Sequence, residues 1–384
     1  MKMAPTAAPA LLLACDLGKS GGKFFYKLLD SSGDQQKRST QALWMDSEVA
    51  HRSVSVVNQV GTGGRSQDNA WYRVGETLTF IGKAAQAHLE YNSFKEDKSL
   101  KAPERIAGAL GAIAHAHHLP SRFAAVVWVL LPIHELSTRS AIASRLQEIC
   151  RGFHFQDQQA YQITLSLSFR PEGYGIYVNR KQQLEKTGMA IAQRTTWVEM
   201  LGHRNGTQLA FETGTLNVAK STSKFPGFWE VFEKAAIASG VSSPDYGVLL
   251  KALETGNAQQ YSAAKDERID LSAAIQQVES GYLAALAPHF NDHLIPGLAS
   301  RQGDVVLAGR AAYLMRSALR RYFEDRGFSE RLSFAWEGDA ELRRWLSEQL
   351  LEVHETPSIP VRMLDCFGVF QALLGEKQRM RGAA

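Results

Sequence analysis

Residues 11–29 read LLLACDLGKSGGKFFYKLL. Two apolar runs, Leu11–Leu17 and Lys23–Leu29, stand on either side of the turn Lys19–Gly22. Two apolar runs around a short glycine-rich turn predict a β-hairpin. We therefore place the first element of the fold here, with Asp16 near the end of its first strand.

The turn of this hairpin has the composition of an anion-binding loop. Backbone N–H groups in a tight turn form a concave nest for anions, and glycine lets the backbone approach a phosphate closely. Ser20 can donate a hydrogen bond, Lys23 can reach back over the turn, and Asp16 can hold Mg²⁺ through water. The segment is not a Walker A motif, which requires G-x-x-x-x-G-K-[ST] at the start of a helix. The alternative is an ordinary hairpin, because turns are commonly rich in glycine.

The rest of the chain alternates between predicted strands and helices. Apolar runs bounded by turn residues predict strands at 71–75, 124–131, 161–169, 195–201, 208–212, 215–219, 304–308 and 361–364. Apolar residues at helical spacing predict helices at 98–117, 142–149, 176–189, 271–297, 315–322 and 367–374. The polar, glycine- and serine-rich residues 46–69 predict a long loop. Mixed strands with crossover helices predict an α/β fold, and the hairpin, strand and helix theme recurs from about residue 195.

Length and composition limit the class of protein. The chain has 384 residues, with 43 Lys and Arg against 39 Asp and Glu, and a net charge of +4. This small excess does not indicate nucleic-acid binding by itself. Hydrophobic residues make up 45% and charged residues 21%, which excludes a collagen-like, coiled-coil or mostly disordered chain. At roughly 100–200 residues per domain, the length predicts two domains.

The cysteine content and the N-terminus favour a cytoplasmic protein. Three cysteines are too few for a disulfide framework, and a reducing compartment fits best. No apolar run approaches the roughly 20 residues that span a bilayer, so we expect no membrane contact. Residues 12–15 (LLAC) are similar to a bacterial lipoprotein processing site. The preceding apolar stretch is short, contains Pro9 and has only Lys2 as a flanking charge, so we interpret Cys15 as part of a buried strand.

The loop at Asp16–Lys23 resembles the first phosphate loop of the actin, heat-shock-chaperone and sugar-kinase superfamily, with Asp-x-Gly and a lysine seven positions after the aspartate. Other segments fall in the order of the bacterial actin-like plasmid-segregation family (the ParM/StbA type). They are Val74–Glu76, Ala125–Glu135, Arg170–Gly175, Met200–Thr207, Val305–Ala312 and Leu364–Gly368. Together the matches span about residues 11–374.

The resemblance implies an actin-like α/β fold, in which two domains with mixed sheets flanked by helices enclose a nucleotide cleft. Domain I would cover residues 11–180, with a C-terminal helix at 365–376 returning to it. Domain II would cover residues 181–364, leaving flexible tails at 1–10 and 377–384.

The resemblance also implies which residues bind ATP and Mg²⁺. Asp16 would hold the metal and take part in catalysis, and Glu172 would orient the attacking water. Read without the resemblance, Glu172 is a solvated residue of a Pro-Glu-Gly turn. Phosphate contacts would come from Gly18, Lys19, Ser20, Gly21, Lys23, Gly202, His203, Arg204 and Asn205. Adenosine would lie against Gly309 and Arg310.

Two departures from the family pattern affect the chemistry. The second phosphate loop usually begins Asp-x-Gly, but here Met200 stands at the aspartate position with Glu199 beside it. We expect His203 or Arg204 to contact phosphate in its place, because cations stabilise a γ-phosphate. Arg310 stands where a second glycine is usual, and it would either stack on the purine or block it.

The leading hypothesis is therefore an ATPase that polymerises into filaments for plasmid or DNA segregation. Its partners would be further copies of itself and a DNA-binding adaptor, with no direct nucleic-acid contact expected because no dedicated DNA-binding motif is visible. One alternative is an actin-like scaffold that binds nucleotide with weak or no hydrolysis. The other is a small-molecule kinase of the same superfold.

Overall fold

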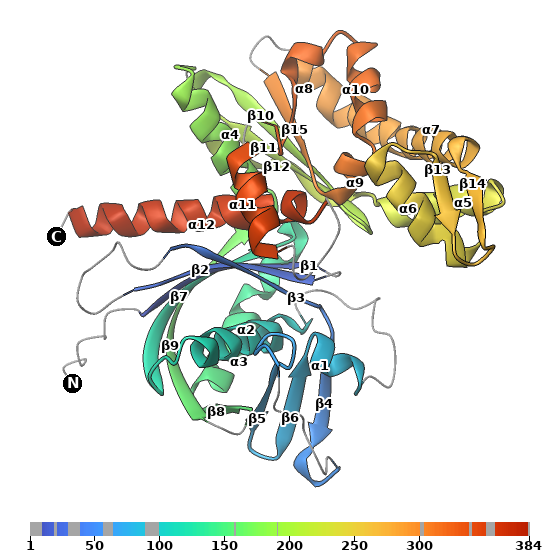
Figure 1. Cartoon of the computed structure of the whole chain (residues 1–384). Helices are drawn as coiled ribbons and strands as arrows, with labels where there is room; N and C mark the ends of the chain where they lie inside the picture. Colours follow the sequence, from blue (N-terminus) through green and yellow to red (C-terminus); the bar gives the residue numbers. More distant parts are fainter. Residues whose placement is uncertain are drawn as a thin grey trace. The chain divides into compact units, whose positions relative to one another are not determined.

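The computed structural model describes residues 10–18, 21–29, 39–56, 64–88, 100–156, 159–189, 191–299, 303–337, 340–350 and 358–382. The chain forms two compact units (Figure 1). Unit 1 consists of Met1–Pro171 with Val369–Ala384, and unit 2 consists of Glu172–Gly368. The chain thus crosses between the units at 171/172 and at 368/369, where the sequence analysis places the domain boundaries at 180/181 and 364/365.

Unit 1 is built on one mixed sheet. Within the described residues its order is β3-β2-β1-β7-β9-β8-β5-β6-β4. The strands are β1 (Leu11–Gly18), β2 (Gly21–Leu28), β3 (Gln41–Met45), β4 (Val49–Ser53), β5 (Trp71–Val74), β6 (Thr77–Ile81), β7 (Arg122–Leu131), β8 (Phe153–Phe155) and β9 (Gln159–Pro171). The predicted hairpin is β1 paired antiparallel with β2, and β7 lies parallel to β1 on its other side.

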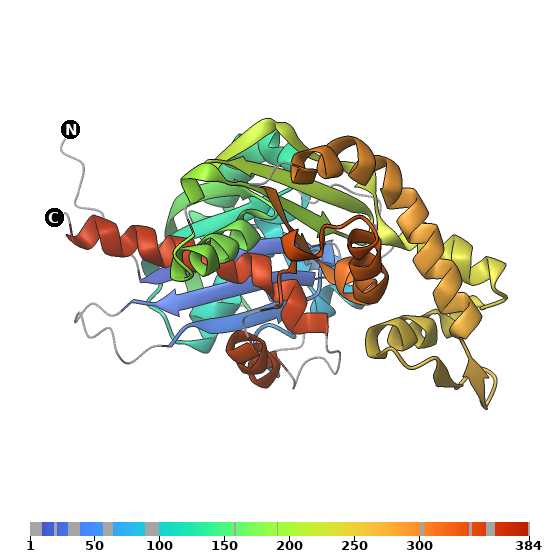
Figure 2. The same cartoon turned by 90° about the horizontal axis from the view of Figure 1, so that it is seen from above.

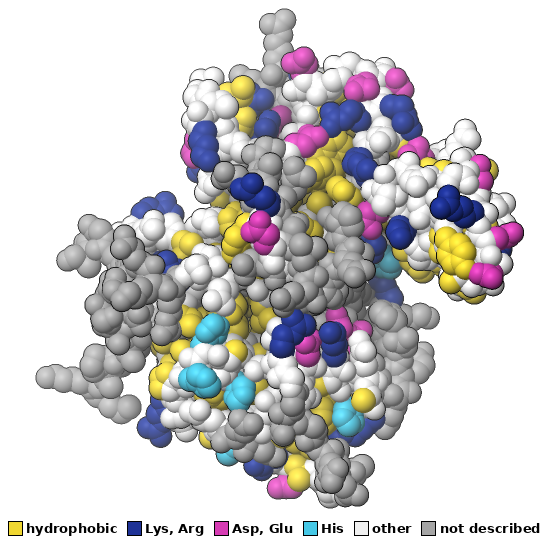
Figure 3. Space-filling view, viewed as in Figure 1, with side chains coloured by type: hydrophobic (Ala, Val, Ile, Leu, Met, Phe, Trp, Pro, Cys, Tyr) yellow, Lys and Arg dark blue, Asp and Glu magenta, His cyan; other side chains and the backbone are white. Residues whose placement is uncertain are grey.

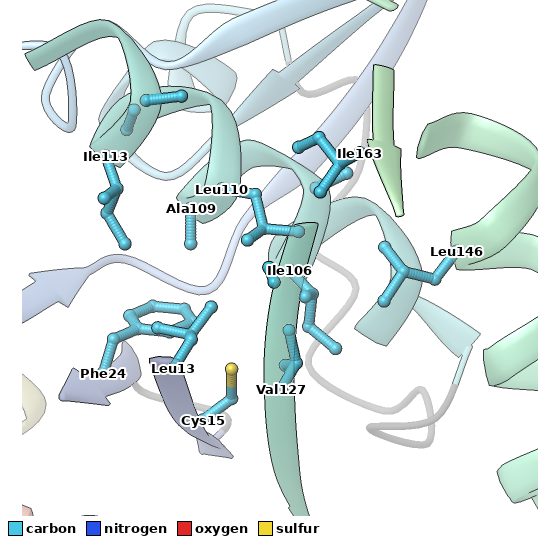
Figure 4. Close-up of a cluster of buried hydrophobic side chains, with 14 of the residues drawn as sticks. Leu13, Cys15, Phe24, Ile106, Ala109, Leu110, Ile113, Val127, Leu146 and Ile163 are labelled. Atoms are coloured by element: carbon cyan, nitrogen blue, oxygen red, sulfur yellow. The ribbon is translucent and has the colours of Figure 1, made fainter. Parts of the chain in front are cut away.

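Helices α1 (Lys83–Gln86), α2 (Ala102–Ala116) and α3 (Arg139–Cys150) belong to unit 1, and α2 and α3 lie against one face of the sheet (Figure 1). Leu13, Cys15 and Val127 point from the sheet toward Ile106 and Leu110 of α2 (Figure 4). All eight residues of β1 are buried, because both faces of this central strand are covered. The interpretation of Cys15 as part of a buried strand is confirmed.

Unit 2 repeats the central part of this sheet. Its described strands have the order β12-β11-β10-β15-β16. They are β10 (Thr195–Leu201), β11 (Asn205–Glu212), β12 (Thr215–Pro226), β15 (Gly303–Ala308) and β16 (Leu332–Phe334). As β1 pairs antiparallel with β2 and parallel with β7, β10 pairs antiparallel with β11 and parallel with β15. The predicted α/β class and the recurrence of the hairpin theme near residue 195 are confirmed.

The helices of unit 2 are α4 (Tyr174–Lys186), α5 (Phe228–Ala238), α6 (Tyr246–Thr255), α7 (Ser272–His289), α8 (Ile295–Ala299), α9 (Arg310–Leu314), α10 (Arg316–Glu324) and α11 (Ala340–Leu350). Of these helices, α4, α7, α8 and α9 contact the second sheet, while α5, α6 and α10 pack against α7. The π-helical turn Phe290–Leu294 joins α7 to α8 without a gap, in a helical segment that bends along its course (Figure 2). A small hairpin, β13 (Gln259–Ser262) with β14 (Glu267–Asp270), follows α6.

Three parts of the sequence interpretation are wrong. Residues 46–69 contain β4, which pairs with β6 over its whole length although it has no regular apolar alternation. Residues 361–364 are not a strand but lie in α12 (Ser358–Gly382), where Pro360 falls in the first turn and is tolerated. The same helix includes residues 377–382, which the sequence analysis assigns to a tail. Of the predicted N-terminal tail, only Ala10 is among the described residues.

Candidate nucleotide-binding site

The β1–β2 hairpin of unit 1 brings the first group of predicted site residues together. Asp16 pairs with Lys23 in the strand register, and Gly18 pairs with Gly21 at the end of the ladder. The Lys23 Nζ donates to Asp16 Oδ2 at 2.5 Å, and both side chains are almost fully buried. The two turn residues, Lys19 and Ser20, lie outside the described residues.

Arg105 of α2 donates hydrogen bonds to the end of β1, and it is not among the predicted site residues. Its Nη1 donates to the carbonyl of Leu17 and its Nη2 to the carbonyl of Gly18, each at 3.0 Å. Burial lowers the pKa of Arg105 to about 10, while the carboxylates of Asp16 and Glu48 act in the opposite direction. The guanidinium therefore stays charged at neutral pH and fixes the last two carbonyls of β1.

Gly21 is required by a close approach. A Cβ at this position would lie 2.3 Å from the ring of Trp44, and its φ of +156° is one that L side chains rarely adopt. The indole of Trp44 is 5% exposed. A larger residue at Gly21 would displace this buried ring and with it the path of the turn.

The β10–β11 hairpin of unit 2 has the same strand register as the first, counted from its turn. Leu201 pairs with Gly206 and Met200 with Thr207, so that His203 and Arg204 form a two-residue turn between Gly202 and Asn205. The first turn of α5 packs on it: the N–H of Phe228 donates to the Gly202 carbonyl at 3.1 Å and that of Trp229 to the His203 carbonyl at 2.8 Å.

Counting from the turns, each hairpin can be superposed residue by residue on the other. Gly202 then corresponds to Gly18, and Met200 corresponds to Asp16. The partner of Asp16 is Lys23, whereas the partner of Met200 is Thr207. The buried ion pair of the first hairpin is thus replaced by two uncharged side chains in the second.

Glu199 cannot stand in for the missing acid. Successive side chains of a strand point to opposite faces, and Glu199 is fully buried, with its Oε2 3.2 Å from Nε2 of His289. Burial raises the pKa of Glu199, and the hydrogen bond with His289 acts in the opposite direction. The ring of His289 stacks on Phe225 at 4.0 Å, so this pair belongs to the packing between α7 and the sheet.

Cationic side chains gather around His203. Its ring packs on Trp229 with the ring centroids 4.8 Å apart, although the residue as a whole is exposed. Burial of the ring, and then the charges of Arg310, Arg204 and Arg362, lower the pKa of His203 to about 4. His203 is therefore neutral at pH 7, and the guanidinium groups carry the positive charge of this region. Arg362, on α12, is another residue that the sequence analysis misses.

The turn after β15 lies beside the second hairpin. Gly309 has a φ of +90°, and a Cβ there would lie 2.5 Å from the carbonyl oxygen of Leu201. Arg310 begins α9, with Nη2 3.9 Å from Oε2 of the buried Glu254. Its Nε is buried and has no hydrogen-bond partner among the described residues. The structure thus brings Gly309 and Arg310 to the end of β10 where Gly202 and His203 lie.

Glu172 lies in the turn between β9 and α4. A Cβ on the next residue, Gly173, would lie 3.3 Å from the side chains of Met200 and Val198, so this turn packs on β10 two residues before Gly202. Gly173 has a φ of +95°. The carboxylate of Asp365 accepts hydrogen bonds from the N–H groups that follow Glu172. Glu172 is therefore near the second hairpin within unit 2.

Other polar side chains outside these two hairpins have local roles. Nε2 of His117 lies 2.9 Å from the Tyr26 hydroxyl. On α10, Arg320 pairs with Glu337 and Arg321 with Glu279. Charges of both signs are interspersed over this part of the surface shown in Figure 3. Among the described residues, no helix is long and apolar enough to cross a membrane.

Each unit by itself offers groups that fit a phosphate. Unit 1 has a glycine hairpin with the buried Lys23, and unit 2 has a glycine hairpin with three guanidinium groups around His203. Backbone N–H groups and cationic side chains of this kind bind phosphate oxygens. For Mg²⁺ the described residues offer no cluster of three or more acidic, histidine or cysteine ligands. The single carboxylate of Asp16 is enough for the usual pattern, because Mg²⁺ takes one or two carboxylates and keeps waters and substrate phosphates as its other ligands.

No family model and no curated protein matches the sequence. Several solved structures match nearly the whole chain. The actin-like protein Alp7A is 11% identical with a TM-score of 0.65, covering 97% of this chain and 99% of its own. A non-polymerisable quadruple mutant of pCBH ParM is 14% identical with a TM-score of 0.55, covering 96% and 99%.

ParM of Bacillus thuringiensis with ATP is 10% identical with a TM-score of 0.55, covering 95% of this chain and 100% of its own. These identities are low, so the likeness concerns architecture. The matched part spans nearly the whole chain and therefore includes both units. The chain therefore has the two-domain α/β fold of the actin-like proteins, as its sequence motifs predict.

Proposed function

We propose that this protein is an actin-like ATPase that binds Mg-ATP and assembles into filaments. The observation that carries the proposal is the duplicated glycine hairpin, one in each unit, with Lys23 at the first and the guanidinium cluster at the second. A structural relative with this fold has been solved with ATP, and another is described as a non-polymerisable mutant. Both descriptions support a nucleotide-dependent polymer here.

In this proposal each hairpin contributes contacts to the phosphates of the nucleotide. The backbone of the first turn, with Gly18, Lys19, Ser20 and Gly21, and the ammonium of Lys23 hold phosphate oxygens. Gly202, His203, Arg204 and Asn205 hold phosphate from the second turn, with Arg204 supplying charge while His203 stays neutral. Arg310 adjoins this turn, and its unpartnered Nε supports a role in holding the nucleotide rather than in blocking it.

Catalysis would rest on positioning and charge, as in phosphoryl transfer generally. Mg²⁺, when bound with ATP, would neutralise charge on the phosphate oxygens, and Asp16 is the residue that fits it. Glu172 would orient the attacking water by accepting a hydrogen bond. Arg204 and Arg310 would stabilise negative charge on the phosphates.

For the cellular role we propose plasmid or DNA segregation in the bacterial cytoplasm. The filament partner would be a second copy of this chain. A repeated head-to-tail contact that does not close on itself produces an open polymer. A separate DNA-binding adaptor would connect the filament to its cargo, with no direct contact between this chain and nucleic acid or membrane.

The test combines pelleting with phosphate release. The wild-type protein should sediment with Mg-ATP, show filaments by negative-stain microscopy and release phosphate, and it should remain in the supernatant without nucleotide. Glu172→Ala should bind ATP with unchanged affinity and release phosphate on the order of 10²-fold more slowly, so that its filaments persist longer. Absence of a pellet at any salt or protein concentration would remove the polymer from the proposal. Wild-type turnover in Glu172→Ala would remove that residue from catalysis.

A scaffold with weak or no hydrolysis is the second candidate. The observation that favours it is the replacement of the Asp16–Lys23 pair by Met200 and Thr207 in the second hairpin. A single-turnover assay separates the two candidates. ATP binding and nucleotide-dependent pelleting without phosphate release above background would support the scaffold.

A further inference from the structure

The carboxylate of Asp365 holds the backbone that follows Glu172. Asp365 Oδ2 accepts a hydrogen bond from the Gly173 N–H at 2.7 Å, and its Oδ1 accepts from Gly175 at 2.8 Å and Ile176 at 3.2 Å. Asp365 is 2% exposed. Hydrogen bonds from backbone N–H groups to a buried carboxylate are charge-assisted and about twice as strong as neutral ones. The start of α4 is therefore tied to residue 365 of α12.

Further contacts fix α12 against the same segment. Asn179 Nδ2 donates to the carbonyl of Leu364 at 3.3 Å. A Cβ on Gly368 would lie 2.0 Å from the carbonyl oxygen of Gly175, so the two backbones are in direct contact. All of these residues belong to unit 2. The contacts leave little freedom for the turn that carries Glu172.

The conformation of this turn also needs an external restraint. Gly173 has a φ of +95°. It precedes the first residue of α4, and the first N–H groups of a helix have no partner within the helix. No side chain at the start of α4 caps the helix. Asp365, about 190 residues away in sequence, supplies the acceptor instead and places a negative charge at the positive end of the helix dipole.

We propose that Asp365 is a positioning residue for hydrolysis: it holds the Glu172–Gly173 turn so that the Glu172 carboxylate can orient the attacking water. Asp365 acts through backbone N–H groups and does not touch nucleotide. This inference rests on the role proposed for Glu172. It predicts that loss of the carboxylate lowers the rate of the chemical step while ATP binding is retained, since the phosphate-binding hairpins are not altered.

The main variant is Asp365→Asn, which keeps the shape of the side chain but puts an amide NH₂ where a carboxylate oxygen accepts a hydrogen bond. A displacement of about 1 Å at a catalytic group can reduce turnover on the order of 10²-fold. We expect kcat to fall about 10- to 100-fold with the ATP dissociation constant unchanged. In the Glu172→Ala background, Asp365→Asn should cause no further loss, because both changes remove the same function.

The matched control is Asp245→Asn. Asp245 is a second buried aspartate of unit 2 and lies at the start of α6. It accepts hydrogen bonds from the hydroxyl groups of Ser262 and Ser242. The Asp245→Asn variant should have a lower melting temperature but a kcat within about twofold of wild type, since the hydrogen bonds of Asp245 do not reach Glu172. Circular dichroism would confirm that every variant is folded at the assay temperature. If Asp365→Asn does not fold, Asn179→Ala is the milder variant, with kcat expected to fall about threefold at unchanged ATP affinity.

Amide hydrogen exchange provides a readout that is independent of hydrolysis. The N–H groups of Gly173 and Gly175 should be protected in the wild type and exchange faster in Asp365→Asn. The positioning role is overturned if the wild type hydrolyses ATP and Asp365→Asn has the same kcat. If Asp365→Asn does not fold, a wild-type kcat in Asn179→Ala overturns it instead. It is also overturned if Asp365→Asn slows the Glu172→Ala protein further. A wild type without hydrolysis would instead defeat the proposed function, and the positioning role with it, whatever the exchange data show.

Discussion

At the scale of single residues, the Asp16–Lys23 pair carries both structure and proposed chemistry. The side chains are 5% and 11% exposed, and their 2.5 Å contact joins two strands. A buried charge that loses its partner is costly because it remains out of water. A change in ATP affinity on mutating either residue could therefore come from altered folding or from a lost ligand contact, and a double variant separates the two.

Lys23→Met should lower the free energy of unfolding by roughly 3 kcal/mol, because the Asp16 carboxylate would stay buried without its ammonium. Asp16→Asn combined with Lys23→Met should recover most of that stability, since neither side chain is then charged. ATP affinity should remain low in both proteins if Lys23 binds phosphate. Urea unfolding and titration with a fluorescent ATP analogue give the two quantities. Wild-type ATP affinity in the double variant would show that the pair has only a structural role.

At the scale of elements, glycine turns place the candidate binding groups. Gly309 separates β15 from α9 and brings its backbone against the end of β10. Its φ of +90° with ψ of 165° is a conformation that is essentially limited to glycine. Gly256, which ends α6, also has a positive φ of +73°, but nothing lies within 4 Å of a Cβ placed there. The two positions therefore compare a left-handed glycine in open space with one whose conformation is limited to glycine and whose backbone is closely approached.

Gly256→Ala should cost about 1 kcal/mol, the usual price of a left-handed conformation for an L residue, and should leave ATP affinity unchanged. Gly309→Ala should cost roughly 3 kcal/mol, because strain is joined by contact with the Leu201 carbonyl, and it should weaken ATP binding by displacing β10. Thermal unfolding and ATP titration of both variants provide the comparison. Equal losses in the two proteins would contradict the close approach as the reason for glycine at 309.

At the scale of the whole molecule, the same hairpin occurs once in each unit, and the proposal assigns phosphate contacts to both. A ligand that binds only the folded protein stabilises it by about 2.7 kcal/mol at 100 times its dissociation constant. Stabilisation by Mg-ATP should therefore depend on residues from unit 1 and from unit 2.

Saturating Mg-ATP should raise the Tm of the wild-type protein. Lys23→Met in unit 1 and Arg204→Ala in unit 2 should each reduce that rise at a fixed ATP concentration. Lys234→Ala is the control: this lysine on α5 is exposed, and among the described residues it forms an ion pair with Glu230 four residues earlier. Differential scanning fluorimetry gives the shifts. An undiminished rise in Arg204→Ala would mean that the second hairpin contributes no phosphate contact through this side chain.

Local pattern was enough to predict the hairpins and the central strands. The apolar runs at 11–17 and 124–131 are buried on both faces. A strand of this kind can be predicted from its sequence, because nearly all of its residues are apolar. The pairing of Asp16 with Lys23 needed the structure, because the predicted turn Lys19–Gly22 is two residues longer than the one that sets the register. The class of fold followed from the repeated order of these elements.

Contacts between distant segments could be found only in the folded protein. Arg105, Arg362 and Asp365 reach hairpins or turns that are far away along the chain. Asp365 lies in the matched segment Leu364–Gly368, but nothing in that segment names the N–H groups that its carboxylate accepts from. Strand β4 forms because β6 lies beside it, not because its own five residues prefer a strand. The sequence by itself thus determined the hairpins, the α/β class and the glycine turns, through hydrophobic periodicity and backbone conformation. Only the tertiary structure decided which buried charges support those turns, because the partner of a buried polar group is chosen by packing across the whole unit.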